Sequence, residues 1–153
     1  IPDSFEIARK MSLSYSFGIA NLTSAHPNSV VLEVKGKSGR TLEVQACSLG
    51  GGRIMINRLD GLDVNCSCEI PTLIVHNLDQ PGHVAEVTSM LAHKSVNIAN
   101  MSLYRDKRGG SAVMVVEMDQ PLPKESLEWL EHLEGIVKVT YINVTEGEED
   151  DVL

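Results

Sequence analysis

The turn at residues 77–82 carries the residue types best suited to holding a small charged ligand. Asn77 and Asp79 stand before Pro81 and Gly82, a pair that typically ends an extended segment and opens a helix. The first N–H groups of a helix have no partner inside it, and together with the helix dipole they favour a carboxylate. Since Asn77 and Asp79 suit an ammonium or a hydroxyl, the turn predicts a site for a free amino acid.

Two further side-chain amides, those of Asn97 and Asn100, follow on the next extended segment and are candidates for the same site. A structural explanation stays open beside this one. In it Pro81 and Gly82 only start the helix, and the asparagines only cap turns.

Cys66 and Cys68 occupy alternate positions of an expected strand, with Cys47 elsewhere in the chain. Iron–sulfur clusters usually take cysteines separated by two or more residues, so this spacing favours small buried thiols instead. The odd number of cysteines is unlike a secreted disulfide framework, and no signal peptide or membrane-length apolar run occurs. We therefore expect a cytoplasmic protein without a membrane partner.

The triple glycine at residues 50–52 invites comparison with a phosphate-binding loop. It lacks the strand-to-helix context and the Lys-Ser/Thr ending of such loops, so a tight turn between strands is favoured. A second anion site nevertheless stays a candidate, formed by His26, Asn28, Gly50, Gly51, Gly52 and Arg53. Neither a metal-ligand spacing nor a Ser/His/Asp arrangement is readable, so no metal site and no catalytic residue are predicted.

Period-two hydrophobic alternation dominates the first half of the chain after a short helix. A capping box at residues 3–6 opens that helix. Residues 13–19, 30–34 and 42–46 then alternate as strands with one buried face, and Asp60-Gly61 predicts a hairpin between residues 53–56 and 62–64.

The second half begins at Pro71 and reads as strand, helix, two strands, helix and strand. The segment Ala112–Met118 is apolar on both faces and should lie centrally in its sheet. Ile136–Val144 is the last strand. The chain is thus α+β, with a hairpin-rich first half followed by a ferredoxin-like βαββαβ unit.

The formal net charge of -8 is concentrated in the acidic tail at residues 146–153. Without the five acidic residues of that tail, 16 acidic residues remain against 13 basic ones. The tail is expected to be disordered, and the acidic balance argues against nucleic acid as a partner.

The segment Leu73–Val84, followed by Ser95–Ala99, resembles an ACT domain, a small amino-acid-sensing βαββαβ module. The family pattern has an Asp/Arg-x-Pro-Gly turn and a Val-Asn-Ile entering the second strand, and both occur here at the expected separation. The resemblance covers roughly residues 72–144. It implies effector positions at Asn77, Asp79, Pro81, Gly82 and Asn97, and we include His83, Val84 and Asn100 beside them.

The preceding half is similar to the C-terminal part of the β chain of bacterial iron–sulfur-dependent L-serine dehydratases (L-serine ammonia-lyases). The similarity rests on the Ile-Pro-Asp-Ser start, His26-Pro27-Asn28, the segment Ser48–Ile54 and Leu59-Asp60-Gly61. In that family an allosteric-substrate-binding domain precedes the ACT domain, which predicts boundaries at residues 1–70 and 71–145. A related pair of domains closes some D-3-phosphoglycerate dehydrogenases, and the triple glycine and the start favour the dehydratase.

The resemblance implies an enzyme that converts L-serine to pyruvate and ammonia with a [4Fe–4S] cluster. The cluster's cysteines belong to the α chain in that family, so this chain is expected to carry no cofactor and to be inactive alone. Its expected partners are L-serine, the α chain and a second copy paired through ACT domains. Since no initiator Met precedes Ile1, we also expect the chain to lie inside a larger polypeptide. A ligand-free dimerisation module stays an alternative.

Overall fold

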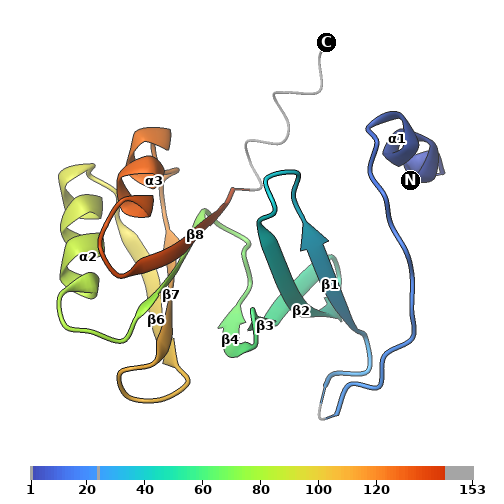
Figure 1. The fold of residues 1–153 in the computed structure, drawn as a ribbon, viewed down its shortest axis with the longest axis horizontal. Helices are drawn as coiled ribbons and strands as arrows, with labels where there is room; N and C mark the ends of the chain where they lie inside the picture. The colour runs from blue at the N-terminus through green and yellow to red at the C-terminus, as the bar shows by residue number, and fades with distance from the viewer. Residues whose placement is uncertain (1, 24, 144–153) are drawn as a thin grey trace.

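A computed structural model describes residues 2–23 and 25–143 of the chain. Two helices, a four-stranded sheet and a second four-stranded sheet form three successive layers (Figure 1). The acidic tail at residues 146–153 lies outside the described residues. Within them, no helix is long and apolar enough to cross a membrane.

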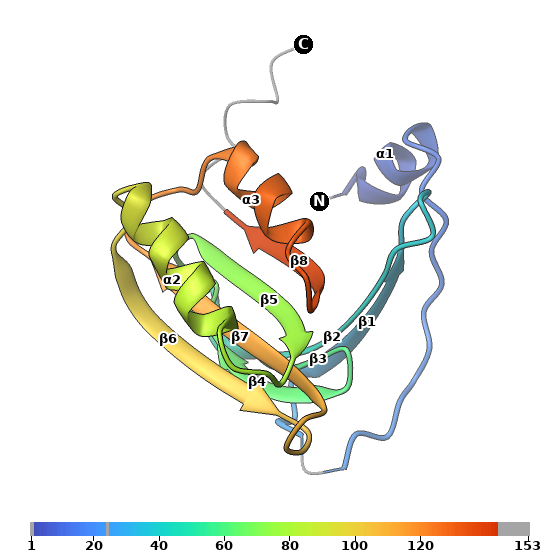
Figure 2. The ribbon, with the colours of Figure 1, turned by 60° about the vertical axis from the view of Figure 1, so that its left-hand side comes forward.

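The second half forms a helix-covered antiparallel sheet. In chain order its elements are β5 (Thr72–Leu78), α2 (His83–His93), β6 (Ile98–Arg105), β7 (Ser111–Met118), α3 (Lys124–Glu131) and β8 (Ile136–Ile142). The strands lie in the order β6-β7-β5-β8, which is the βαββαβ arrangement expected from the sequence. Both helices cover the same face of this sheet (Figure 2).

The first half forms a meander of four antiparallel strands after the short helix α1 (Ser4–Lys10). The strands are β1 (Ser29–Lys35), β2 (Thr41–Gly50), β3 (Arg53–Leu59) and β4 (Leu62–Cys66). The triple glycine makes the turn between β2 and β3, and Asp60-Gly61 makes the turn between β3 and β4. Both turns were expected from the sequence.

The two sheets pack face to face and share a hydrophobic core. Val113 and Val115 of β7 are buried with Ile74 of β5 against Ile56 and Leu59 of β3. The opposite face of the same strands is buried beneath α2 and α3. The residues of this second cluster include Leu73, Val75, Met114, Val116, Leu91 and Leu130. The strand that is apolar on both faces is therefore central, as predicted, and is covered by a layer on each side.

Polar contacts also join the two halves. Lys138 of β8 pairs with Asp60 in the β3–β4 turn and donates to the Thr41 carbonyl at 2.8 Å. His76 Nε2 lies 3.6 Å from the same Asp60 carboxylate. The Arg40 guanidinium reaches Glu131 at 3.3 Å and also donates to the Val139 carbonyl.

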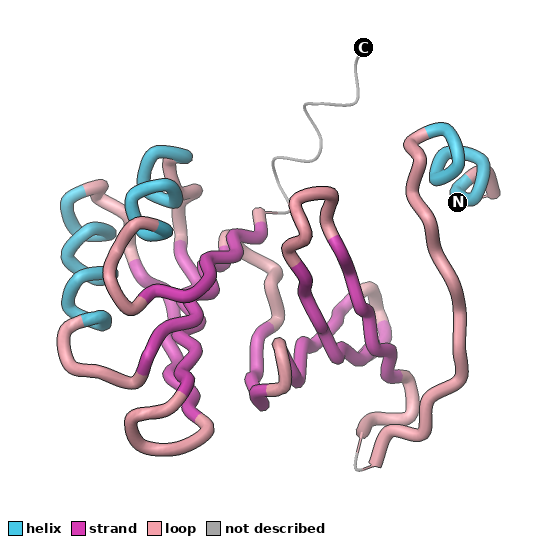
Figure 3. Tube along the Cα trace, viewed as in Figure 1, coloured by secondary structure: helices cyan, strands magenta, loops and turns pink. Residues whose placement is uncertain are grey.

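The expected strand at residues 13–19 is wrong. This segment is extended but belongs to neither sheet, and Phe17 and Ile19 are almost wholly exposed (Figure 3). Its alternating side chains do not pack on either sheet and its backbone pairs with no strand of the two sheets, so alternation alone does not produce a strand. Phe5, Tyr15 and Phe17 instead pack their rings together, with centroids 5.3 to 6.2 Å apart.

The capping box predicted at residues 3–6 is also not formed. Helix α1 begins at Ser4 with Asp3 as its N-cap, but no side chain bonds the free N–H groups there. Glu6 pairs with Lys10 at 3.1 Å, one helical turn away, instead of reaching back.

Candidate functional site

The turn between β5 and α2 is built around Gly82, which has a φ of 113°. An L side chain rarely adopts this conformation, so glycine lets the chain reverse sharply into the helix. No side chain caps the N-terminus of α2, and its first internal bond runs from the Glu86 N–H to the Gly82 carbonyl. The N–H groups of the first helical turn are thus directed at the surface beside residues 77–82.

Asp79 fixes this turn to the loop between β6 and β7. Its Oδ2 accepts hydrogen bonds from the Gly109 N–H at 2.9 Å and from Arg105 Nη1 at 3.1 Å. The bond from Gly109 and the charge of Arg105 hold the pKa of Asp79 below its ordinary value. Asp79 is therefore an ionised carboxylate that already shares its charge with a guanidinium.

Asn77 and His83 lie at the two ends of the turn and are both buried. The Asn77 side-chain N–H₂ donates to the Leu78 carbonyl at 2.6 Å. His83 Nδ1 lies 3.1 Å from the Glu86 carboxylate, while its buried Nε2 has no hydrogen-bond partner among the residues that the structure describes. Sequence reasoning left the role of His83 open, and the structure places it between the turn and Gly135.

A cavity of about 230 Å³ opens beside this turn. The turn and α2 contribute Asn77, Asp79, Gln80, His83 and Val84 to its walls, whereas β6 and β7 contribute Leu103, Tyr104, Arg105, Ala112 and Met114. Its lining thus combines an apolar floor with a carboxylate, a guanidinium and an amide, which is the composition of a site for a small zwitterion. Arg105 was missed by the sequence reasoning, because its approach to Asp79 depends on how β6 lies relative to β5.

Asn97 and Asn100 lie at the other end of β6. Asn100 is level with Glu117, whereas Arg105 is level with Ala112, which also pairs with Asn77. Five residues along β7 correspond to roughly 17 Å. Within one chain, these two amides are therefore not brought to the cavity; Asn97 bonds Asp119 at 2.5 Å and Asn100 bonds Glu117 at 2.9 Å.

The residues of the second candidate anion site gather at one end of the first sheet. The Ser48 N–H donates to the Asn28 carbonyl at 2.9 Å, which places Asn28 beside the end of β2 and its glycine turn. The Asn28 N–H in turn donates to His26 Nδ1 at 3.2 Å. Arg53 pairs with Gly50 across the turn. The grouping is geometric, and anion binding at Gly50, Gly51, Gly52 and Arg53 stays a prediction.

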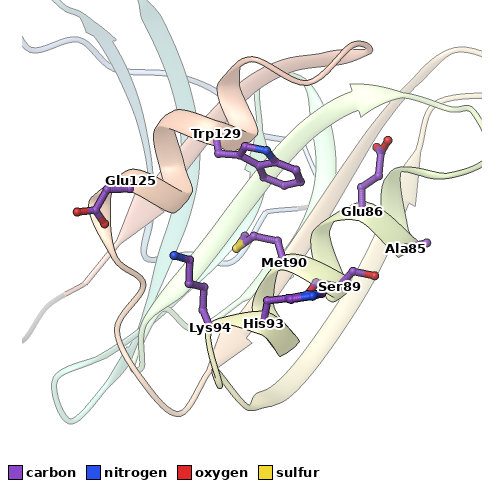
Figure 4. A pocket seen from close by; sticks show the side chains of 8 residues that line it. All are labelled: Ala85, Glu86, Ser89, Met90, His93, Lys94, Glu125 and Trp129. Carbon is purple, nitrogen blue, oxygen red and sulfur yellow. The ribbon is translucent and has the colours of Figure 1, made fainter.

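A larger groove of about 640 Å³ runs between α2 and α3 on the outer helical face (Figure 4). The indole of Trp129, 46% exposed, overhangs Met90, with Lys94 and His93 at one end (Figure 4). The groove is separate from the turn at residues 77–82. Sequence reasoning did not single it out, because Trp129 lies beside the buried stripe of α3 and not on it.

The three thiols do not fit an iron–sulfur cluster. Cys66 and Cys68 converge, but across the described ranges no group of three or more His, Cys, Asp or Glu side chains is arranged to hold a metal ion. Cys47, Cys66 and Cys68 are all buried, as the sequence favoured.

The second half of the chain is similar to a known family. Residues 71–134 match the ACT domain family. The match begins just before β5 and ends between α3 and β8, so it includes three of the four strands of the helix-covered sheet.

Two relatives match nearly the whole chain. The chain is 31% identical over 142 residues, 93% of its length, to a probable L-serine dehydratase, beta chain, of Bacillus subtilis (strain 168). It is 28% identical over 145 residues, 94% of its length, to an L-serine dehydratase, beta chain, of Peptoniphilus asaccharolyticus. The chain spans 64% and 65% of the length of these two relatives.

A shorter similarity points to a second class of protein. The chain is 31% identical over 90 residues, 59% of its length, to a D-3-phosphoglycerate dehydrogenase of Methanocaldococcus jannaschii, of which it covers 17%. A D-3-phosphoglycerate dehydrogenase of Bacillus subtilis (strain 168) matches 90% of the chain, at 24% identity over 139 residues, and the chain covers 26% of it. The two beta chains are more similar to the chain over a comparable length, and the chain covers a larger share of each.

Proposed function

We propose that this chain is the regulatory part of an L-serine dehydratase beta chain and binds L-serine, because residues 71–134 match the ACT domain family and two such beta chains match nearly the whole chain. The observation that supports this most is the cavity beside the β5–α2 turn, with the uncapped start of α2 on one side and the Asp79–Arg105 pair on the other. A free amino acid carries an ammonium and a carboxylate on one carbon atom, and it therefore needs hydrogen-bond donors and a negative charge side by side.

The two charges of the amino acid are matched by different parts of the turn. The carboxylate is held by the N–H groups of the first turn of α2, where the helix dipole also favours a negative charge. The ammonium lies toward the Asp79 carboxylate and the side-chain oxygen of Asn77. Leu103, Val84 and Met114 exclude water from the apolar side of the cavity.

We propose that the catalytic part of the enzyme, including a [4Fe–4S] cluster, resides on the α chain. The three thiols of this chain are buried, and only one residue separates Cys66 from Cys68, a spacing that iron–sulfur clusters do not usually use. The chain then contributes L-serine sensing and assembly with the α chain, and no bond-breaking step. Three free thiols suit the reducing cytoplasm, which we propose as its compartment.

Asn97 and Asn100 can reach an amino-acid site if two chains form a dimer. β6 is an edge strand of its sheet. If two copies pair antiparallel about the middle of β6, each Ile98 lies opposite the partner's Arg105, so each Asn97 comes beside the partner's Asp79–Arg105 pair. We therefore propose a homodimer through β6, in which both chains contribute to each amino-acid site.

Calorimetric titration with L-serine tests the sensing function. We expect saturable heat with L-serine and none with D-serine. Asp79→Asn should weaken binding about tenfold, because the variant loses a charge-assisted contact with the ammonium. Asp63→Asn is the matched control, because Asp63 is a highly exposed carboxylate that does not line this cavity. Absence of heat with L-serine, or equal weakening by both variants, would overturn the proposal.

The dimer has its own test by light scattering. Ala99→Lys places a charge on the exposed edge of β6 and should give monomers that bind L-serine more weakly. Val137→Lys, on the exposed edge strand β8, is the matched control and should stay dimeric. Monomers from Val137→Lys alone would place the interface on β8 and contradict the β6 arrangement.

The regulatory end of a D-3-phosphoglycerate dehydrogenase is the alternative function. The residues that precede Ile1 discriminate between the two: a Ser-Ser-His-Thr stretch supports the dehydratase, and a nucleotide-binding Gly-x-Gly-x-x-Gly supports the dehydrogenase. A chain that dimerises without binding L-serine would be a dimerisation module only.

A further inference from the structure

Cys66 and Cys68 bring their sulfur atoms within 3.1 Å of each other where the first sheet leads into the ACT domain. Cys66 is the last residue of β4, and Cys68 lies in the segment that leads to β5. Cys68 has a φ of 53°, so the chain curls after the strand and folds the second thiol over the first. In a regular strand, positions two residues apart share a face but lie roughly 7 Å from each other.

The two thiols have different acidities. A hydrogen bond from the Cys68 thiol holds the pKa of Cys66 below its ordinary value. The same bond, together with burial, raises the pKa of Cys68. The Glu117 carboxylate, 4.0 Å from the Cys66 sulfur, opposes ionisation of either thiol. Cys66 is therefore the nucleophile of the pair and Cys68 the donor that stabilises it.

We propose that Cys66 and Cys68 are a reversible redox pair that closes to a disulfide by exchange with a low-molecular-weight disulfide. The Cys66 thiolate attacks one sulfur of the small disulfide, which forms a mixed disulfide and releases the first small thiol. Cys68 then loses its proton and attacks the Cys66 sulfur, which releases the second small thiol. Two thiols are oxidised, one small disulfide is reduced to two small thiols, and no other reactant is needed.

The geometry needs only a local change for this reaction. The sulfur atoms must approach by about 1 Å to reach the bonded distance of about 2.05 Å. Residues 67–71 belong to no strand, so their local opening exposes both buried thiols without separating the two sheets.

Oxidation of the two thiols would change hydrogen bonds that reach β6. Ser67, the residue inside the ring that the disulfide would close, donates its hydroxyl to Glu117 Oε1 at 3.2 Å. The other oxygen of Glu117 accepts a hydrogen bond from the Asn100 side chain at 2.9 Å. Ring closure repositions Ser67 and so alters the contact through which Glu117 holds Asn100.

Alkylation after exposure to glutathione disulfide tests the proposal. The chain is incubated with glutathione disulfide, quenched in acid, denatured, alkylated and weighed by mass spectrometry. Of the three cysteines, all should be alkylated in the reduced chain and only Cys47 in the oxidised chain. The peptide that contains residues 66–68 should lose the mass of two hydrogens and regain it with dithiothreitol.

Cysteine variants show which two sulfur atoms form the bond. They need not be as stable as the parent chain, because the peptide mass already reports disulfide formation in the unaltered protein. Cys47→Ser should still lose both remaining alkylation sites, whereas Cys68→Ser should stop at a mixed disulfide on Cys66. The proposal is overturned if all three thiols stay alkylatable, if glutathione remains attached to Cys66 in the unaltered chain, or if the bond includes Cys47 or a second chain.

Discussion

The imidazole of His83 lies directly against Gly135, so that a Cβ added to Gly135 would stand 2.6 Å from Nε2 and 2.7 Å from Cε1. Gly135 has a φ of 80°, and its carbonyl accepts a hydrogen bond from the Leu78 N–H at 2.9 Å. This contact joins the start of α2, the end of β5 and the turn from α3 into β8. The N-terminus of α2, which faces the amino-acid cavity, is therefore held in place by the packing of His83 on Gly135, a glycine 52 positions after His83 in the chain.

Gly135→Ala should destabilise the chain by about 2–5 kcal/mol, because a left-handed alanine costs about 1–2 kcal/mol and overpacking against His83 adds about 1–3 kcal/mol. Urea denaturation measures this loss. Gly39→Ala is the matched control, since Gly39 also has a positive φ (84°) but nothing within 4 Å of an added Cβ. Equal losses for the two variants would contradict the packing role of His83.

The polar junction between the halves predicts a pH-dependent stability. Burial lowers the pKa of His76 despite the nearby Asp60 carboxylate, while Lys138 and Arg40 oppose its protonation further. As pH falls, His76 therefore binds a proton in the unfolded chain before it does so in the folded chain. The contribution of neutral His76 to the free energy of unfolding is fully present above about pH 6.5 and is lost as pH falls below that value.

Asp60 extends the same trend to lower pH. Burial would raise the pKa of Asp60, but hydrogen bonds from Lys138 and the Glu43 N–H outweigh burial and lower it. Its contribution is present above the unfolded value near 3.8 and is lost as pH falls through the folded pKa. Stability should thus decline in two stages from pH 7 downwards.

Denaturation at pH 7, 6 and 5 tests the histidine stage. His76→Gln should flatten the dependence in this range, whereas His93→Gln, which changes an exposed histidine of α2, should keep it. An unchanged slope in His76→Gln would show that the junction does not respond through His76.

The shared core predicts that the two sheets lose stability together. Ile74 is fully buried between them, so Ile74→Ala should cost about 2–5 kcal/mol. Hydrogen exchange should then quicken in β3 and β4 as well as in β5 and β7. Ile54→Ala, at a position 46% exposed, is the control and should have a small effect. Faster exchange confined to β5 and β7 would indicate sheets that unfold independently.

Much of the ACT half could be predicted because its local patterns agree with its fold. The apolar faces of β7, the glycine that opens α2 and the glycine after α3 each carry a signal in a few neighbouring residues. The same held for the hairpin at Asp60-Gly61. Such turns depend on backbone conformations that few residue types adopt, so short segments identify them.

The rest depends on contacts between distant segments. Leu13, Tyr15, Phe17 and Ile19 alternate as a strand does, yet only a neighbouring strand can make them one. The pairing of Asp79 with Arg105 and the packing of His83 on Gly135 likewise follow from how strands and turns meet in space. The sequence pattern groups Asn97 and Asn100 with Asp79 in one site. In the fold they lie at the opposite end of β6 from Arg105, which is the end that contacts Asp79.

Binding of L-serine at the β5–α2 turn is tested most directly by two-dimensional NMR. On addition of L-serine, the backbone amides of His83 and Val84 and the side-chain amide of Asn77 should shift and reach saturation together. D-serine should leave these signals in place, and the exposed Asn21 should not respond to either. Signals of His83, Val84 and Asn77 that stay unchanged at saturating L-serine would contradict the account.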